Sequence, residues 1–158
     1  MHMTRSKRVL STSAAVLAIV GLTAGPALAD GSIGHSLLRA PLMGSSPTGP
    51  TIAGVVPGGA PWVNGPSNVR VREDGRITVK IQGLVIPSLG ISPIHSVVAT
   101  LVCDNMVKAS TKAFALSNEG DGSTSDVISV PRHCDDPVVL IQIAGRNAYI
   151  ASTFGEDD

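Results

Sequence analysis

The segment VRVREDGRITVKI, residues 69–81, alternates apolar and polar side chains on both sides of Asp74-Gly75. A period of two gives a strand one buried and one exposed face, and Asp-Gly between two such runs is typical of a hairpin. The exposed face of this hairpin would carry Arg70, Arg72, Arg76, Thr78 and Lys80. Such a face is either a binding patch or an ordinary solvated sheet surface, and we favour the solvated surface.

The rest of residues 67–154 consists of short strand-like runs. Strands are expected at 95–103, 106–111, 127–130, 138–144 and 148–153. Residues 83–87 are expected to extend or restart the second strand of the hairpin, and residues 113–116 to continue the strand at 106–111. The apolar run VVLIQIA, residues 138–144, predicts a central strand covered on both faces, whereas SNEGDGSTSD, residues 117–126, predicts a loop. About seven strands without a helix predict an all-β, immunoglobulin-like β-sandwich, with a small β-barrel as the alternative.

The N-terminal segment has the three parts of a secretory signal peptide. Three basic residues precede an apolar stretch over residues 9–23, and Ala27-Leu28-Ala29 places small residues at positions −3 and −1. The apolar stretch is short and ends at Gly25-Pro26, which favours cleavage over a signal anchor. We therefore expect residues 1–29 to be removed and the protein to be secreted and extracellular, with no membrane span.

Residues 30–66 are expected to form a flexible lead-in to the domain. Between Pro41 and Pro66, 12 of 26 residues are Gly or Pro, which disfavours a helix or a central strand. Trp62, the only tryptophan, is expected to dock this lead-in onto the domain, with an exposed ligand platform as the alternative. Residues 155–158 are expected to form an acidic tail.

Loss of the signal peptide changes the charge balance. The chain has 12 Lys and Arg and 12 Asp and Glu; three of the basic residues and none of the acidic ones lie in residues 1–29. The mature part therefore has a net charge of 9 − 12 = −3. With no basic cluster visible in the sequence, nucleic acid and anionic membranes are poor candidate partners.

Cys103 and Cys134 are the only cysteines, and an even pair in an exported protein predicts one disulfide rather than two reactive thiols.

The heptad PRHCDDP around Cys134 has the composition of a metal site. A disulfide removes the thiolate, however, and adjacent side chains of an extended chain point in opposite directions. We therefore expect no metal site; the weak candidates are Asp104, His133 and Asp136. A second acidic set, Glu119, Asp121 and Asp126, lacks the spacing of a calcium-binding EF-hand loop.

No motif in the sequence indicates catalysis. It has no Gly-x-Ser-x-Gly elbow, no His-Glu-x-x-His, no Walker loop and no dinucleotide fingerprint. We expect a non-enzyme without a cofactor, acting as a secreted binding or cell-surface interaction module. The alternatives are a carrier of a small apolar ligand, with a cleft between the sheets or near Trp62, and a hydrolase assembled from distant residues. Candidate partners are a cell-envelope component and a small apolar ligand.

Five segments follow one another in a characteristic order: PWV (61–63), DGRITVKIQGLVIP (74–87), SPIHSVVATLVC (92–103), EGDGSTSDVISVPRHCDDPVVLIQ (119–142) and AYIAST (148–153). This order resembles a family of small secreted bacterial proteins of actinobacterial type. The resemblance implies a β-sandwich with paired cysteines. The family has no known activity, so no catalytic or binding residues carry over to this chain. A more distant similarity is to the immunoglobulin-like apoproteins of actinomycete chromoprotein antibiotics, which have two disulfides where this chain can form one.

Overall fold

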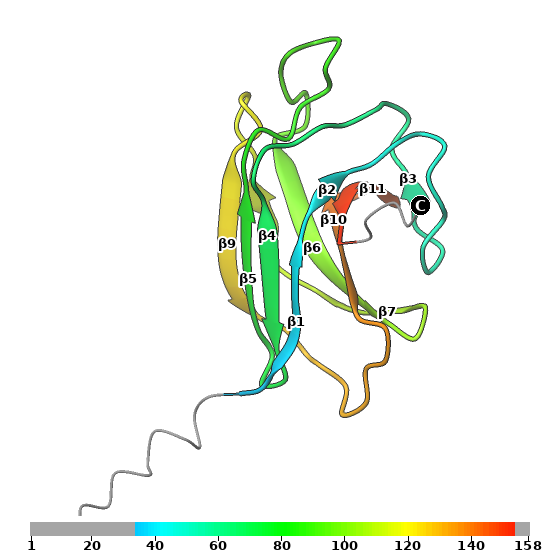
Figure 1. Cartoon of the computed structure of the whole chain (residues 1–158), viewed down its shortest axis with the longest axis vertical. Coiled ribbons are helices and arrows are strands. Elements are labelled where there is room, and N and C mark those ends of the chain that lie inside the picture. The colour runs from blue at the N-terminus through cyan, green and yellow to red at the C-terminus, as the bar shows by residue number, and fades with distance from the viewer. Residues whose placement is uncertain (1–33, 154–158) are drawn as a thin grey trace, which may run out of the picture. The chain divides into compact units, whose positions relative to one another are not determined.

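The computed structural model describes residues 34–153, so the predicted signal peptide, the first residues of the predicted lead-in and the predicted acidic tail lie outside the described residues. The described residues form two β-sheets packed face to face and contain no helix (Figure 1). The prediction of an all-β sandwich is confirmed. The barrel alternative is wrong, because within residues 34–153 the two sheets do not close into one. No helix in this part of the chain could cross a membrane.

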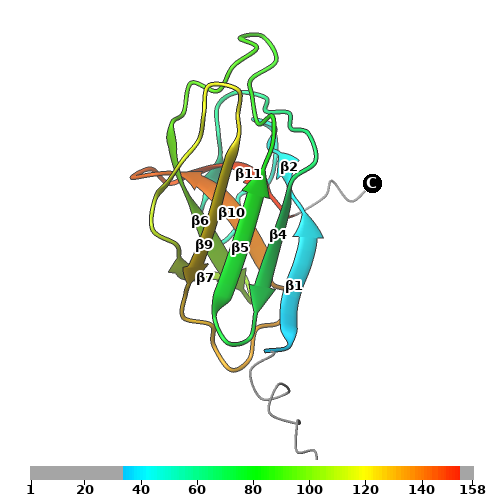
Figure 2. The ribbon, with the colours of Figure 1, turned by 90° about the vertical axis from the view of Figure 1, so that its left-hand side faces the viewer.

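The first sheet has four antiparallel strands in the order β1-β4-β5-β9 (Figure 2). The strands are β1 (Ser36–Pro41), β4 (Asn68–Arg72), β5 (Arg76–Ile81) and β9 (Gly122–Val127). β4 and β5 form the predicted hairpin, with Val69 opposite Val79. In the turn between them Gly75 has a φ of 95°, a conformation that side chains disfavour, and its N–H donates to the carbonyl oxygen of Arg72 at 3.0 Å.

The second sheet has seven strands. Five lie in the order β2-β11-β10-β6-β7, while β3 pairs with β11 and β8 pairs with β6; only the β3–β11 pair is parallel. The strands are β2 (Met43–Gly44), β3 (Val56–Pro57), β6 (Ser96–Cys103), β7 (Met106–Ser110), β8 (Phe114–Ala115), β10 (Val138–Ile143) and β11 (Ala148–Ser152). The prediction of a central strand at 138–144 is confirmed, since β10 lies between β6 and β11.

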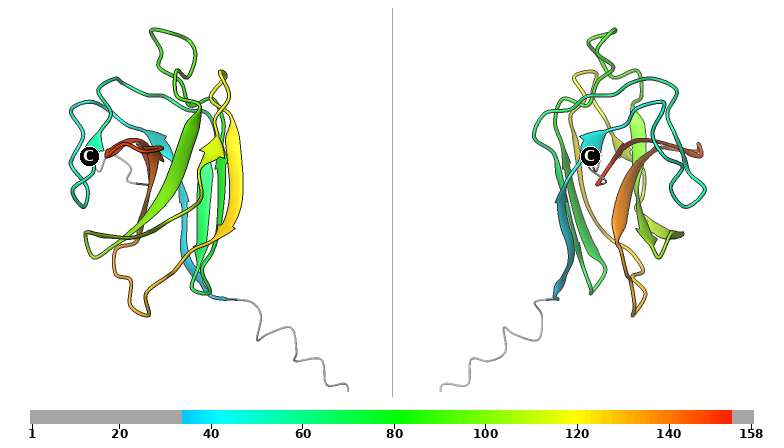
Figure 3. Two further views of the ribbon diagram at one scale, coloured as in Figure 1. Left: turned by 180° about the vertical axis from the view of Figure 1, so that it is seen from behind. Right: turned by 45° about the vertical axis from the view of Figure 1, so that its right-hand side comes forward.

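Apolar side chains pack on both faces of the second sheet. Val139 and Ile141 of β10 point into the main core, which lies between the sheets. Val138 and Leu140 point the other way, into a smaller cluster. That cluster is completed by residues of the segment between β2 and β3, which lies beside β11 (Figure 3). β10 is therefore covered on both sides, which explains its unbroken apolar sequence.

The prediction of a flexible lead-in is wrong for residues 34–66. β1 pairs with β4, and both Leu42 and Trp62 belong to the main core. Gly and Pro exclude a helix here, but the short strands satisfy their backbone groups through distant segments: Trp62 N–H donates to the carbonyl oxygen of Ser45. The described residues from 34 onward therefore belong to one compact unit, and the chain has no domain boundary at residue 66.

The number of strands and several of their boundaries also differ from the sequence prediction. Residues 34–153 form eleven strands rather than about seven, because β1, β2 and β3 arise in the predicted lead-in and several strands have only two residues. β9 occupies Gly122–Val127, so it takes up the second half of the predicted loop and the first residue of the predicted strand 127–130, and no strand forms at 128–130. β5 ends at Ile81, so 83–87 does not extend it; Val85 and Ile86 make only isolated bridges. The polar run 122–127 becomes a strand because it pairs with the exposed edge of β5, and this pairing overrides its weak propensity.

The two cysteines form a disulfide, as the sequence predicts. The bond joins Cys103 at the end of β6 to Cys134, in the connection that leads to β10, with the Cα atoms 4.9 Å apart. Next to it, the N–H of Asp104 donates to the carbonyl oxygen of Asp135 at 3.0 Å. Because the bond closes a loop over a sequence separation of 31, the chain-entropy estimate of its stabilisation is about 3–4 kcal/mol.

Tyr149, the only tyrosine, ties the segment between β2 and β3 to the second sheet. Its side chain is 2% exposed, and its O–H donates to the carbonyl oxygen of Pro50 at 2.6 Å. Burial raises the pKa of the Tyr149 phenol above its ordinary value of 10.0, because the phenolate would lose its hydration.

Titration of Tyr149 should therefore reveal this burial. Phenolate absorbance of the folded protein should have a midpoint above pH 10, the ordinary value. Because the pKa of Tyr149 is higher in the folded than in the unfolded protein, its protonated phenol contributes to the unfolding free energy. This contribution is complete below the unfolded pKa and is lost as the pH rises through the folded pKa. Y149F should not show this loss of unfolding free energy at alkaline pH. At neutral pH it should be less stable than the wild type by about 1 kcal/mol, because the hydrogen bond to Pro50 is removed. An ordinary midpoint in the folded protein, or an equal alkaline loss in Y149F, would contradict this account.

Candidate functional site

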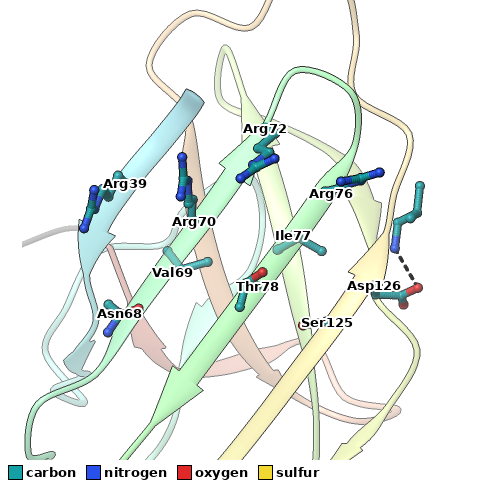
Figure 4. Close-up of a pocket in the computed structure, with 11 residues that line it drawn as sticks. Arg39, Asn68, Val69, Arg70, Arg72, Arg76, Ile77, Thr78, Ser125 and Asp126 are labelled. Atoms are coloured by element: carbon teal, nitrogen blue, oxygen red, sulfur yellow. Dashed lines mark hydrogen bonds between the residues drawn. The ribbon is translucent and has the colours of Figure 1, made fainter. Parts of the chain in front are cut away.

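The outer face of the first sheet gathers basic side chains from three strands (Figure 4). Alternation along β4 and β5 turns the residues between the buried valines and isoleucines toward solvent. The register places Arg39 of β1 opposite Arg70 of β4, while Arg72 and Arg76 flank the hairpin turn. We call these four residues the arginine face. They border a depression of about 610 Å³ that also reaches β9.

Three residues of the arginine face have no carboxylate partner among residues 34–153. The exception is Arg76, whose Nε lies 3.7 Å from an Oδ atom of Asp74 in a partly exposed pair. Exposed pairs of this kind contribute little to stability. Arg39, Arg70 and Arg72 form no ion pair within the described part of the chain. The face therefore presents largely uncompensated positive charge.

Asp126 also borders the depression, but its carboxylate is already engaged. It accepts hydrogen bonds from the backbone N–H groups of Lys112, at 2.9 Å, and of Val127, at 2.8 Å. These two bonds lower the pKa of Asp126 below its ordinary value, since they stabilise the ionised form. Asp126 thus links β9 to the segment after β7 and does not pair with the arginines.

Arg70 lies at the centre of the arginine face. Its cross-strand neighbours are Arg39 on one side and Thr78 on the other. The Nε atom of Arg70 is buried and has no hydrogen-bond partner within residues 34–153. A directly opposed like charge and an unpaired buried donor both cost free energy. Such a local cost in an otherwise well-paired sheet is typical of a site that serves binding.

The sequence identified part of this surface and missed the rest. It grouped Arg70, Arg72, Arg76, Thr78 and Lys80 on one strand face, and the exposure pattern of β4 and β5 confirms that grouping. The local pattern leaves out Arg39, because the composition of its segment predicts a lead-in rather than a strand. The expectation that the chain has no basic cluster is also wrong, since pairing of β1 with β4 brings Arg39 beside Arg70. No local signal around Arg39 could have shown this.

The candidate metal ligands are not brought together. Within residues 34–153 no group of three His, Cys, Asp or Glu side chains could hold a metal ion, and this applies to the set Asp104, His133 and Asp136. It applies equally to Glu119, Asp121 and Asp126. Asp121 instead accepts a hydrogen bond from the N–H of Gly83 at 2.9 Å, which is a structural role in the loop.

A second concavity, of about 510 Å³, lies next to the disulfide. It is lined by five apolar residues and four polar ones: Leu38, Ile52, Val102, Pro137 and Val138, and Asp104, Asn105, Asp136 and Thr153. We call it the apolar cleft. Its lining residues come from β1, from the segments next to Cys103 and Cys134, and from Thr153, which follows β11. Because these segments are far apart in the sequence, the cleft forms only in the folded domain.

Trp62, the sequence candidate for ligand contact, lies away from both concavities. It is 6% exposed, belongs to the main core and lines neither depression. Its position fits the role of docking the N-terminal segment rather than that of an exposed platform.

Comparison with protein-family models, curated proteins and solved structures found no match. Function is therefore inferred from the charge, exposure and geometry of the side chains.

Replacement of Arg70 by Thr should stabilise the free protein. R70T removes the repulsion from Arg39 and the unpaired Nε, and we expect the unfolding free energy to rise by about 0.5 kcal/mol at low ionic strength. The gain should shrink as salt is added, because exposed charges are screened. Urea denaturation at low and high salt measures both effects.

The matched control for this substitution is R76T, because Arg76 is paired with Asp74. R76T should leave the unfolding free energy unchanged or slightly lower. A loss of stability in R70T at low salt, or a gain that is independent of salt, would show that Arg70 is not under electrostatic strain.

Proposed function

We propose that the protein is a secreted, non-catalytic binding module that attaches to an anionic component of the cell surface through the arginine face. One observation carries this proposal: Arg39, Arg70 and Arg72 lie on one rigid sheet face without a carboxylate partner among the described residues. An isolated exposed arginine needs no explanation. Three uncompensated arginines around one depression, with a buried unpaired Nε at their centre, favour an anionic ligand.

The distribution of charge over the mature chain supports the same role. With residues 1–29 removed, the chain carries nine Lys and Arg against 12 Asp and Glu. Four of those nine basic residues form the arginine face. The surface is therefore locally positive in a protein whose net charge is negative. Such segregation attracts an anion to one face and repels it from the rest of the molecule.

The positions of the potential catalytic groups support binding rather than hydrolysis. Both cysteines are joined in the disulfide, so neither supplies a thiolate nucleophile. The ring of His95 lies 3.4 Å from the carbonyl oxygen of Leu116, and His133 lies in the connection before β10. A hydrolytic site requires a nucleophile and a base within hydrogen-bond reach of each other. None of the three histidines among residues 34–153, namely His35, His95 and His133, lines the depression of the arginine face.

Co-sedimentation with cell-envelope fractions tests the proposal. The wild-type domain should bind an anionic fraction at low salt and be released as salt is raised. The double reversal R39E/R72E should weaken binding by about tenfold or more, since it inverts two charges on the face.

The matched control is K108E/R146E, which makes the same change in net charge on β7 and on the turn before β11. It should bind within about twofold of the wild type, because neither residue borders the depression. Equal binding by R39E/R72E and the wild type, or binding that salt does not weaken, would refute attachment through the arginine face.

The apolar cleft favours a second candidate function, the transport of a small apolar ligand. Its volume of about 510 Å³ lies within the range of small-molecule sites, about 300–1,000 Å³. A neutral lipophilic dye such as N-phenylnaphthylamine should then bind saturably. L38E places a charge in the cleft and should weaken binding by about tenfold or more.

The control for the cleft is L89E, at an exposed leucine that does not line it. L89E should bind the dye as the wild type does. Equal dye binding by L38E and L89E would remove the cleft as the site of an apolar ligand.

A further inference from the structure

We infer that the arginine face recognises a tetrahedral oxyanion, phosphate or sulfate, held between Arg39 and Arg70, and that its natural bearer is a polysaccharide substituted with such groups. The inference rests on the proposed function and names the chemical class of the ligand. It is carried by three features of the face: the row of donors across the sheet, the unpaired Nε of Arg70, and the second arginine pair along the strands.

Four side chains that can donate hydrogen bonds form one row across the first sheet. Arg39 lies opposite Arg70, Arg70 opposite Thr78, and Thr78 opposite Ser125. Neighbouring strands are about 4.8 Å apart, so adjacent members of such a row can reach one small anion. The row thus offers two guanidinium groups and a neighbouring hydroxyl to a single ligand (Figure 4).

In the free protein this row lacks an acceptor of its own. The Nε of Arg70 is buried without a partner, and neither Arg39 nor Arg70 pairs with a carboxylate among the described residues. An oxyanion between the two guanidinium groups would supply acceptors to both and would replace their mutual repulsion by attraction. The same binding event therefore relieves the repulsion between Arg39 and Arg70.

The number of donors favours a tetrahedral oxyanion over a carboxylate. A carboxylate has two oxygens, which one guanidinium fork can occupy. A phosphoryl or sulfuryl group attached to a polymer presents three strong acceptor oxygens. Three acceptors match the two guanidinium groups of Arg39 and Arg70 together with the hydroxyl of Thr78.

The remaining arginines favour a ligand with repeated anionic groups. Arg72 lies two residues beyond Arg70 on β4, a separation of about 7 Å along a strand. Arg76 stands across the hairpin turn from Arg72. A second charged group of one polymer chain can therefore engage this end of the face, and linkage of two weak contacts raises the overall affinity.

The lining of the depression favours a saccharide over a nucleic acid as the bearer of these groups. No aromatic side chain borders the depression in the described part of the chain. Single-stranded nucleic acids are bound by aromatic side chains on which their bases stack. Asn68, Thr78 and Ser125 instead provide amide and hydroxyl groups, which suit the hydroxyls of a sugar backbone.

Dextran derivatives that share one backbone test the inference. Dextran sulfate, dextran phosphate and carboxymethyl dextran of equal charge density are titrated into the mature domain by calorimetry, with neutral dextran as the blank. The sulfate and phosphate derivatives should bind about tenfold or more tightly than carboxymethyl dextran, because only they fill the row of donors. Protonation near pH 6 should weaken binding of the phosphate monoester and leave dextran sulfate unaffected, which separates the two ligands.

Substitutions that keep the charge locate the site. R70K retains the positive charge but lacks the fork and the Nε, and it should weaken binding of dextran sulfate by about tenfold. The control R146K should change binding by less than about twofold, because Arg146 does not line the depression. T78V, which keeps the shape of the side chain, should weaken binding by about threefold through the lost hydroxyl. The Nε–H resonance of Arg70 in the wild type should shift on titration with inorganic sulfate.

The possible results separate this inference from the proposed function. Equal affinity for carboxymethyl dextran and dextran sulfate, or equal binding by R70K and the wild type, would overturn the oxyanion site. If the protein then still bound envelope fractions in a manner that depends on Arg39 and Arg72, attachment through the arginine face would stand with another ligand. If the wild-type protein bound neither the dextran derivatives nor the envelope fractions, both proposals would be overturned.

Discussion

Burial of β10 on both faces is the constraint on which the rest of the domain depends. Its residues 138–141 are all buried, and their side chains alternate between two apolar clusters. The first sheet covers one face of the strand, and the segment between β2 and β3 covers the other. That segment is rich in Gly and Pro, yet it is held by side chains from far along the chain, including Tyr149 and Asn147. An N-terminal stretch with the composition of a linker therefore becomes part of the fold.

The same arrangement leaves the outer face of the first sheet open. The inner side chains of β4 and β5 pack in the main core, so these strands are held in place without help from their exposed residues. The sheet can therefore accept a cross-strand arginine pair and an unpaired Nε at a cost of a few kcal/mol at most. The disulfide adds stability at the opposite sheet. The residues that stabilise the fold and the residues proposed to bind an anion thus lie on different faces of the sandwich.

Local patterning predicted the parts of the fold that depend on neighbouring residues. The hairpin of β4 and β5, the double burial of β10 and the turn before β11 all follow from alternation, β-branched content and turn residues within a few positions. The disulfide followed from the number of cysteines. β1 and β9 were missed because they become strands only by pairing with β4 and β5, and their own residues have little strand propensity. For the same reason the sequence predicted only part of the candidate site. Arg70, Arg72 and Arg76 belong to the local pattern of alternation, whereas Arg39 does not.

The sequence by itself determined which side chains of β4 and β5 face solvent, because alternation along a strand is a property of the chain alone. It also determined that a single disulfide could form, because there are only two cysteines. Only the tertiary structure decided that Arg39 stands opposite Arg70 and that Asp126 is engaged elsewhere. When segments about thirty residues apart pair, many weak contacts must together outweigh the entropy lost on closing the loop between them. No local pattern in the sequence encodes that net free energy.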